Sequence, residues 1–286
     1  MSALLSGIEP TPLIKGDGPE IWGRCSEGDG DRVLWLHGYT LDSSSWGAMW
    51  ERLPGWRHIG LDFPGHGRSA DIDASVSLDG IGRRLARFCE EHDVRHLIAL
   101  SFGTVAALQT AMTVPDHFRT LVLAGPTIAG GPQDPQVQQA YMQLFSRYMQ
   151  GQRGEALRQC WMNCVAWRGV ETVPGLEDAL GSLVTRHRWA ELEGFVIRNV
   201  FMPEQDLEQV RRIRAASLLI VGDQELEAFV QCADTLAGLL PDNRRLQLRD
   251  THHLCLLQSP DQAAGPIGRL LAEHAAQLPQ IIGESA

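Results

Sequence analysis

Short apolar segments alternate with longer amphipathic segments along most of this 286-residue chain. Strands separated by helices are typical of a mainly parallel sheet with helices on both faces, so we predict an α/β fold. The segments predicted as strands are Arg57–Leu61, His96–Leu100, Thr120–Ala124, Ser217–Val221 and Arg244–Leu248. The segments predicted as helices are Ser44–Leu53, Leu78–His92, Phe102–Val114, Ala228–Leu239 and Pro260–Gln277. Near the N-terminus, Glu20–Cys25 and Arg32–His37 flank a Gly/Asp cluster, which predicts a hairpin of two strands.

One long region interrupts this alternation. Between Pro132 and Ile213 no strand-like run stands out, whereas Gln138–Met149 and Gly154–Val165 have apolar residues at helical spacing. We therefore predict a core of residues 1–131 and 214–286, with a helical insertion at 132–213. Most of its aromatic and Met side chains are expected to dock it onto the core, and a minority to line an apolar pocket beneath it. They are Tyr141, Phe145, Tyr148, Met149, Trp161, Met162, Trp167, Trp189, Phe195 and Phe201.

Charge and composition exclude several classes of function. The 25 Lys and Arg against 35 Asp and Glu give a net charge of −10, which repels nucleic acid and anionic membrane surfaces. No apolar run approaches the ~20 residues that span a bilayer, and no basic segment precedes an apolar one at the start, so a cytoplasmic location is expected. The six cysteines include no Cys-x-x-Cys pair, which indicates neither a zinc site nor a disulfide framework. No metal or organic cofactor is implied.

A serine stands where an apolar strand runs directly into a helix. The sequence Leu-Ser-Phe-Gly at 100–103 has the form of a nucleophile elbow, a sharp turn that exposes the hydroxyl of Ser101 beside a helix N-terminus. Such elbows usually read Gly-x-Ser-x-Gly, and Ala99 replaces the first glycine here. A serine at a helix start is also a common N-cap, so the motif needs its context.

Two further motifs supply that context. The turn His37-Gly38-Tyr39 follows an early strand, and Asp-Phe-Pro-Gly-His-Gly-Arg-Ser follows the next one at 62–69. With the elbow, in this order and spacing, the chain resembles the α/β-hydrolase superfamily, in the branch with a helical cap, over nearly its whole length. The resemblance implies a serine nucleophile, and speaks against the aspartate-nucleophile branches.

The resemblance also implies a base near the C-terminal end. In similar proteins the catalytic histidine lies seven residues before a proline, which selects His253 ahead of Pro260. Its neighbour His252 is interpreted as a surface or N-capping imidazole. His37 and His66 are interpreted as structural hydrogen-bonding residues.

The acid and the oxyanion donors complete the implied site. The family's acid generally lies three residues after the glycine that follows the strand, which selects Glu225 and leaves Asp223 as the alternative, interpreted as a turn carboxylate. An acid after the strand that follows the elbow is excluded, because Arg119–Gly131 contains no carboxylate. The oxyanion donors are expected to be the backbone N–H groups of Tyr39 and Phe102.

These residues predict hydrolysis of an ester or thioester of a largely apolar acyl group, through an acyl-serine intermediate. The acyl group is expected on a small molecule or on an acyl carrier. An alternative keeps the same triad for C–C bond hydrolysis, acyl transfer, or chain release and cyclisation. A second alternative is a non-catalytic, ligand-binding member of the fold.

Overall fold

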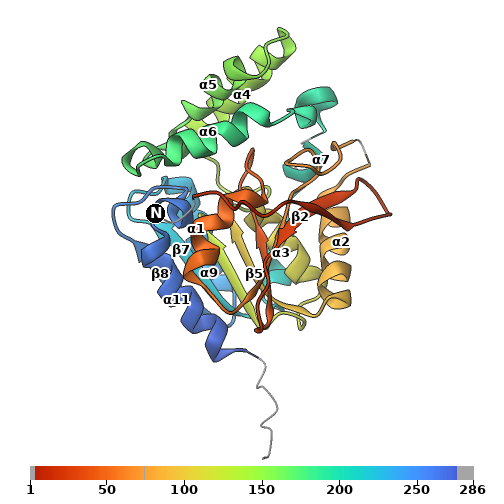
Figure 1. The fold of residues 1–286 in the computed structure, drawn as a ribbon, viewed down its shortest axis with the longest axis vertical. Helices are drawn as coiled ribbons and strands as arrows, with labels where there is room; N and C mark the ends of the chain where they lie inside the picture. The colour runs from red at the N-terminus through yellow and green to blue at the C-terminus, as the bar shows by residue number, and fades with distance from the viewer. Residues whose placement is uncertain (1–3, 74, 197, 202, 276–286) are drawn as a thin grey trace, which may run out of the picture.

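The computed structural model describes residues 4–73, 75–196, 198–201 and 203–275. The strands within these residues are β1 (Thr11–Ile14), β2 (Ile21–Cys25), β3 (Arg32–Leu36), β4 (Arg57–Leu61), β5 (Val94–Leu100), β6 (Thr120–Ala124), β7 (Ala216–Gly222) and β8 (Asn243–Leu248). They form one sheet in the order β1-β2-β4-β3-β5-β6-β7-β8 (Figure 1). All neighbours from β4 to β8 pair in parallel, whereas β1 and β2 are antiparallel. The predicted mainly parallel α/β sheet is confirmed.

The predicted N-terminal hairpin is wrong. Strand β2 pairs with β1 and β4, and β4 separates it from β3. The side chains of β3 are buried on both faces, which suits a strand with a neighbour on each side, whereas β2 is half-exposed and lies nearer the edge. The Gly/Asp cluster therefore connects two strands that are not paired.

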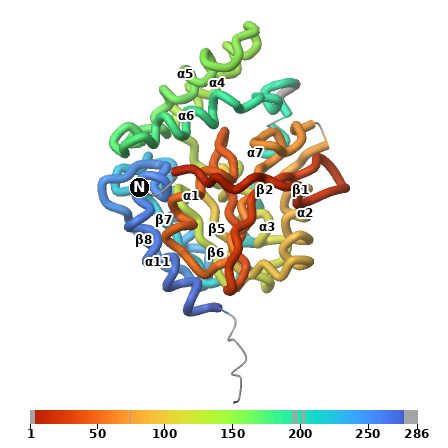
Figure 2. The backbone as a smooth tube through the Cα atoms, in the orientation of Figure 1, coloured from red at the N-terminus to blue at the C-terminus, as the bar shows by residue number. Residues whose placement is uncertain are grey.

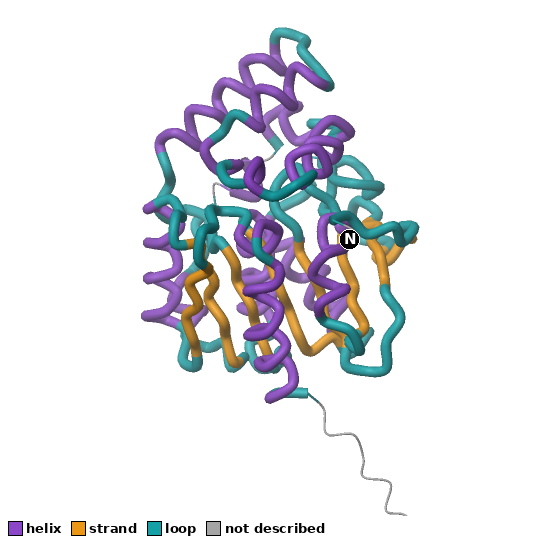
Figure 3. Tube along the Cα trace, turned by 60° about the vertical axis from the view of Figure 1, so that its left-hand side comes forward, coloured by secondary structure: helices purple, strands orange, loops and turns teal. Residues whose placement is uncertain are grey.

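Two buried clusters lie on opposite faces of the sheet. Side chains alternate along β3, so Val33 and Trp35 belong to one cluster and Leu34 and Leu36 to the other. The first face is covered by η1 (Ser43–Trp46), α1 (Gly47–Arg52), α10 (Cys255–Gln258) and α11 (Pro260–Glu273). The second is covered by α2 (Leu78–Glu91), α3 (Phe102–Thr113) and α9 (Glu227–Leu239). Figure 3 shows helices on both sides of the sheet. Gln277, the predicted end of the last helix, lies outside the described residues.

The described part of the chain between β6 and β7 contains helices and no strand. Helices α4, α5 and α6 lie together at one end of the molecule, beyond the sheet (Figures 1 and 3). The elements are α4 (Pro135–Met149), α5 (Glu155–Met162), η2 (Val165–Trp167), η3 (Val170–Thr172), α6 (Leu176–Arg186), η4 (Ala190–Phe195), α7 (Arg198–Phe201) and α8 (Leu207–Val210). We call residues 132–213 the insertion; that they form a separate unit stays a prediction. No helix among the described residues has the length and apolar character to cross a membrane.

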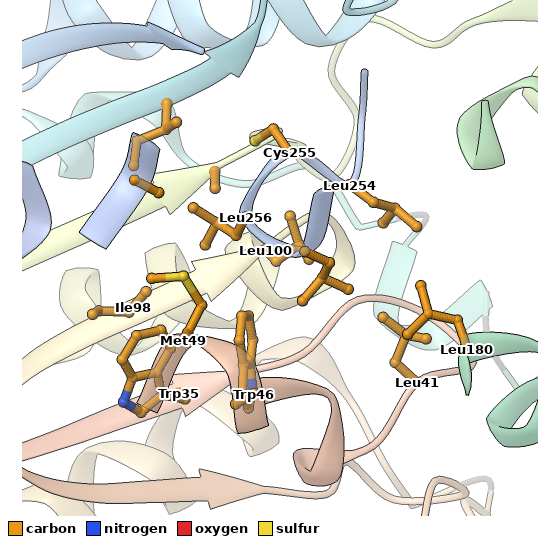
Figure 4. Packing of buried hydrophobic residues seen from close by; sticks show 14 of the residues in the cluster. Trp35, Leu41, Trp46, Met49, Ile98, Leu100, Leu180, Leu254, Cys255 and Leu256 are labelled. Atoms are coloured by element: carbon orange, nitrogen blue, oxygen red, sulfur yellow. The ribbon is translucent and has the colours of Figure 1, made fainter. Parts of the chain in front are cut away.

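The insertion and one face of the core share a hydrophobic cluster. Leu180 of α6 belongs to the same cluster as Leu41, Trp46 and Leu254 of the core, as Figure 4 shows. The insertion therefore docks on the core through apolar side chains.

The N-terminal segment runs across the front of the molecule toward β1 (Figure 2), and the N–H of Ser6 donates to the carbonyl of Ser44 at 2.7 Å.

Candidate active site

Ser101 occupies the turn between β5 and α3 in an unusual backbone conformation. Its φ of 53° and ψ of −123° lie in a region that side chains with a Cβ rarely adopt. Its N–H donates to the carbonyl of Ala124 at 2.9 Å, and its carbonyl accepts from the N–H of Thr104 at 2.8 Å. Such strain persists only where the surroundings hold it, and it is common at functional sites.

The glycine after the elbow is required by close approach of the backbone. A Cβ added to Gly103 would lie 2.3 Å from the carbonyl oxygen of Leu36, at the end of β3. By contrast, Ala99 is fully buried in the cluster of the second face. The elbow therefore accommodates alanine in place of its first glycine, but not a side chain in place of the second.

His253 lies between Ser101 and Glu225. Its Nε2 is 2.7 Å from Oγ of Ser101, and its Nδ1 lies 3.2 and 3.1 Å from the two carboxylate oxygens of Glu225. The three residues follow β8, β5 and β7, whose carboxyl ends meet at one edge of the sheet. The three side chains that the sequence pointed to are thus brought together in the order hydroxyl, imidazole, carboxylate.

Two residues that the sequence did not single out fix the imidazole. Gly125 has a φ of 51°, and a Cβ there would lie 3.0 Å from Nδ1 of His253. The ring of Phe229 stacks on the imidazole, with centroids 4.0 Å apart and planes inclined by 24°. The sequence signal for Phe229 is weak, since it is only its position in the first turn of α9, four residues after Glu225.

The two rival residues point elsewhere. The carboxylate of Asp223 accepts from the N–H of Thr251 at 3.2 Å, as expected of a turn carboxylate. The N–H of His252 donates to Oε1 of Gln258 at 2.7 Å, and its ring faces Gly169 of the insertion, whose added Cβ would lie 2.5 Å from Nδ1. Within the described structure, neither side chain forms a hydrogen bond with Ser101 or His253.

The turn after β3, residues 37–41, lies beside the elbow; we call it the oxyanion turn, after the role predicted for the N–H of Tyr39. An added Cβ on Gly38 would lie 3.5 Å from Cβ of Ser101, and Phe102 is the first residue of α3. His37 holds the turn, because its Nδ1–H donates to the carbonyl of Gly38 at 2.9 Å and its Nε2 accepts from the N–H of Phe63 at 3.1 Å. Burial lowers the pKa of His37, which keeps the ring neutral and its Nε2 able to accept.

His66 is also placed as a structural residue. Its Nδ1–H donates to the carbonyl of Pro64 at 3.1 Å, and its ring stacks on that of Phe102, with centroids 6.1 Å apart. Burial, followed by the neighbouring His187, lowers its pKa well below the usual value. The described geometry therefore agrees with the interpretation of His37 and His66 as hydrogen-bonding residues of the fold.

A buried polar cluster that the sequence did not indicate surrounds Tyr39. Its hydroxyl donates to Oε1 of Glu191 at 2.5 Å, and the same oxygen lies 2.9 Å from Nε2 of His187. Burial by itself raises the pKa of Glu191. The pKa nevertheless lies below its ordinary value, because His187 and Tyr39 stabilise the carboxylate. Burial, and then Glu191, raise the pKa of Tyr39 well above its ordinary value. The cluster thus holds a neutral phenol against a carboxylate.

Only some aromatic side chains of the insertion face this turn. The rings of Tyr141 and Trp161 lie with their centroids 6.0 and 5.3 Å from that of Tyr39. Others, such as Tyr148 and Trp167, are buried in the shared cluster. The side chains of Phe195 and Phe201 lie outside the described residues.

The arrangement has the parts that acyl transfer requires. The imidazole can accept the Ser101 proton, the carboxylate can hold the imidazole in one tautomer, and the two turns offer main-chain donors beside the hydroxyl. In the part of the chain that the structure describes, no three His, Cys, Asp or Glu side chains are grouped to hold a metal ion.

Comparison with known proteins gives a family match. A model described as the alpha/beta hydrolase family matches residues 33–265. Among solved structures, MenH from S. aureus has a TM-score of 0.74 at 20% identity, covering 88% of this chain and 98% of that one. The two proteins share the fold.

Two curated relatives have named activities. Pimeloyl-[acyl-carrier protein] methyl ester esterase from Yersinia pseudotuberculosis is 29% identical over 177 residues, 60% of this chain and 66% of the relative, so slightly less than two thirds of its length is spanned. 2-Succinyl-6-hydroxy-2,4-cyclohexadiene-1-carboxylate synthase from Klebsiella pneumoniae is 30% identical over 214 residues, 72% of this chain and 82% of the relative.

Proposed function

Because the chain belongs to the α/β-hydrolase family, we propose that it is a serine hydrolase that cleaves a carboxylic ester or thioester through an acyl-serine intermediate. The observation that carries the proposal is the unbroken contact from Ser101 through His253 to Glu225 at the carboxyl edge of the sheet. The relatives of this chain include an esterase and a synthase, and ester cleavage would use every part of the site.

The proposed reaction begins with proton transfer. His253 takes the proton of Ser101 as Oγ attacks the acyl carbon, and Glu225 stabilises the imidazolium that forms. The N–H groups of Tyr39 and Phe102 stabilise the oxyanion, each typically contributing about 3 kcal/mol. His253 then gives the proton to the leaving alcohol or thiol, and water releases the acyl group by the same steps in reverse.

The acyl group is proposed to lie beneath the insertion, which we propose to be a cap over residues 1–131 and 214–286. Tyr141 and Trp161 support this, because both face the oxyanion turn from α4 and α5. An apolar acyl chain would replace water against these rings, which is favourable in proportion to the area buried. The protein is proposed to be cytoplasmic, which fits six free cysteines in a reducing compartment.

An acyl carrier is the proposed source of the acyl group. A cleft of about 410 Å³ lies between the oxyanion turn and the insertion, and arginines line it in a chain whose net charge is −10. Arg24 and Arg188 form ion pairs with Asp42 and Asp71, while Arg68 and Arg186 have no carboxylate partner among the described residues. Glu9 and Asp42 also line the cleft, so an anionic group would be attracted only close to the arginines and not across the whole cleft. Such a cleft suits the phosphate and acidic surface of a carrier.

The carrier proposal is tested by comparing two esters of one acyl group. Arg68→Glu is expected to lower kcat/KM for the carrier-bound ester about tenfold, and to leave that for the free methyl ester unchanged. The control is Arg83→Glu at an exposed position of α2, which carries the same charge change away from the cleft. Equal rates of wild type and Arg68→Glu on the carrier ester would remove the carrier from the proposal.

The same triad could instead serve C–C bond chemistry, and similarity to the synthase over 82% of its length is the observation that favours this second candidate. Purified protein would be offered a panel of esters, thioesters and β-diketones, with product analysis by mass spectrometry. Acid and alcohol or thiol as products support the ester proposal, and cleavage of diketones alone would replace it. Failure of a fluorophosphonate probe to label Ser101 would indicate a non-catalytic protein.

A further inference from the structure

Side chains of the insertion form hydrogen bonds with two consecutive residues of the oxyanion turn. Oε1 of Glu191 accepts a hydrogen bond from the hydroxyl of Tyr39 at 2.5 Å. One residue further, the indole N–H of Trp161 donates to Oγ1 of Thr40 at 3.0 Å. Both bonds cross from the insertion to the turn whose main chain is proposed to stabilise the oxyanion.

The turn itself is strained and needs outside support. Thr40 is a β-branched residue with a φ of 63°, a conformation that such residues rarely adopt. Its hydroxyl donates to the carbonyl of Tyr39 at 2.6 Å, and the N–H of Leu41 reaches the carbonyl of Gly38 at 3.2 Å. Because strained backbone persists only where its surroundings fix it, the bonds from the insertion contribute to the shape of the turn.

Packing alone does not explain Glu191. Its side chain is fully buried, and within the described residues its Oε2 has no hydrogen-bond partner. Burial of a carboxylate is unfavourable, and apolar side chains of similar size usually dock elements equally well. Leu180 and Leu183 of α6 already dock the insertion apolarly. Oε1 of this buried carboxylate contacts His187 of the insertion at 2.9 Å and Tyr39 of the turn at 2.5 Å, and the second contact points to a role at the turn.

We propose that Glu191 is a positioning residue, which fixes the Tyr39 N–H for the oxyanion when the insertion is docked. This inference rests on the proposed ester hydrolysis. Glu191 holds the phenol of Tyr39 and Trp161 holds Thr40, so the backbone of Tyr39 is fixed through its own side chain and through the residue that follows it, and its N–H is thereby oriented toward the acyl oxygen. Undocking of the insertion releases both bonds, so the site is complete only with the insertion in place.

The proposal predicts a loss in turnover rather than in substrate affinity. Removal of a whole oxyanion donor lowers kcat about 10²- to 10³-fold, so a donor left in place but loosened should lose part of that. For Tyr39→Phe and Glu191→Leu we expect kcat for a p-nitrophenyl ester to fall about 10- to 100-fold, with KM within about threefold. Glu191→Gln keeps an oxygen acceptor for Tyr39 and should retain most of the activity.

Two further measurements separate positioning from a general structural role. Phenylboronic acid forms a tetrahedral adduct with the serine, and its affinity should fall by the same factor as kcat in Tyr39→Phe and Glu191→Leu. Hydrogen exchange of residues 38–42 should become faster in both variants. The matched control is Glu193→Leu, an exposed carboxylate of the same η4 turn, which should change none of these values.

The kinetics and the boronate affinities of the variants decide whether Glu191 positions the turn. Unchanged kcat and boronate affinity in Tyr39→Phe and Glu191→Leu would overturn it, as would a rise in KM alone. Similar losses in Glu193→Leu would also overturn it. If the wild-type protein cleaved no ester, the proposed function would fail. Even then, faster hydrogen exchange of residues 38–42 in Glu191→Leu would support the role of Glu191 in fixing the turn, and unchanged exchange would refute it.

Discussion

The loops of the core and the insertion reach the same site by different means. The core places Ser101 and His253 through main-chain geometry, namely a strained turn and the close approach of Gly125. Within the residues that the structure describes, the insertion is bonded to the oxyanion turn through the side chains of Glu191 and Trp161. The backbone of the core therefore places the proposed catalytic groups, and the insertion contacts the neighbouring turn through side chains.

The largest expected effect comes from the core. Ser101→Ala should lower ester turnover by about 10⁴- to 10⁶-fold with the fold intact, because it would remove the proposed nucleophile on which the other groups act. Steady-state kinetics and circular dichroism check this. Retention of more than about a tenth of the wild-type rate would mean that the elbow is not the site of chemistry.

The two adjacent histidines test the difference between core and insertion, because His253 faces the core site and His252 faces the insertion. His253→Ala should lose nearly as much activity as Ser101→Ala, since it would remove the proposed base. His252→Ala should keep most of it, because its ring faces Gly169. Rates measured side by side decide the matter, and the reverse order would assign the base to His252.

The acid should have a somewhat smaller effect. Glu225→Gln keeps the size of the side chain but favours the wrong imidazole tautomer, so kcat should fall about 10³- to 10⁴-fold. Asp223→Asn should cost little in kcat and about 1 kcal/mol in the free energy of unfolding, through a weaker acceptor for the Thr251 N–H. An active Glu225→Gln beside a folded, inactive Asp223→Asn would reverse the two roles.

The smallest expected effect belongs to the insertion. Trp161→Phe removes the indole N–H that donates to Thr40 but keeps an aromatic ring against Tyr39. One neutral hydrogen bond contributes about 1 kcal/mol, so we expect kcat to fall about three- to tenfold. Kinetics on the same ester measure this. A loss as large as that of Glu225→Gln would contradict the division between core and insertion.

Features fixed by the main chain could be predicted from the sequence. Arg57–Leu61 and Thr120–Ala124 are strands at the predicted residues, and the contact of Ser101, His253 and Glu225 joins the residues that the motifs selected. Their catalytic roles stay predictions. The motifs succeed because sharp turns at strand ends need particular residues at fixed positions.

Features that depend on distant pairing could not be predicted. The apparent hairpin of β2 and β3 is wrong because β4, later in the chain, inserts between them. Glu191 was missed because its partner Tyr39 is 152 residues away, and no local pattern marks a buried carboxylate. Phe229 was missed for the same reason, since stacking on His253 leaves no trace in spacing.

The positive φ of Ser101 implies a trade-off between stability and activity. Glycine adopts this conformation freely, whereas a residue with a Cβ pays about 1–3 kcal/mol for it. Selection for folding alone would favour glycine at this position, whereas the proposed reaction requires the hydroxyl. The native state therefore carries a fixed local penalty at Ser101, and stabilising substitutions elsewhere would be tolerated more readily than any relaxation of this turn.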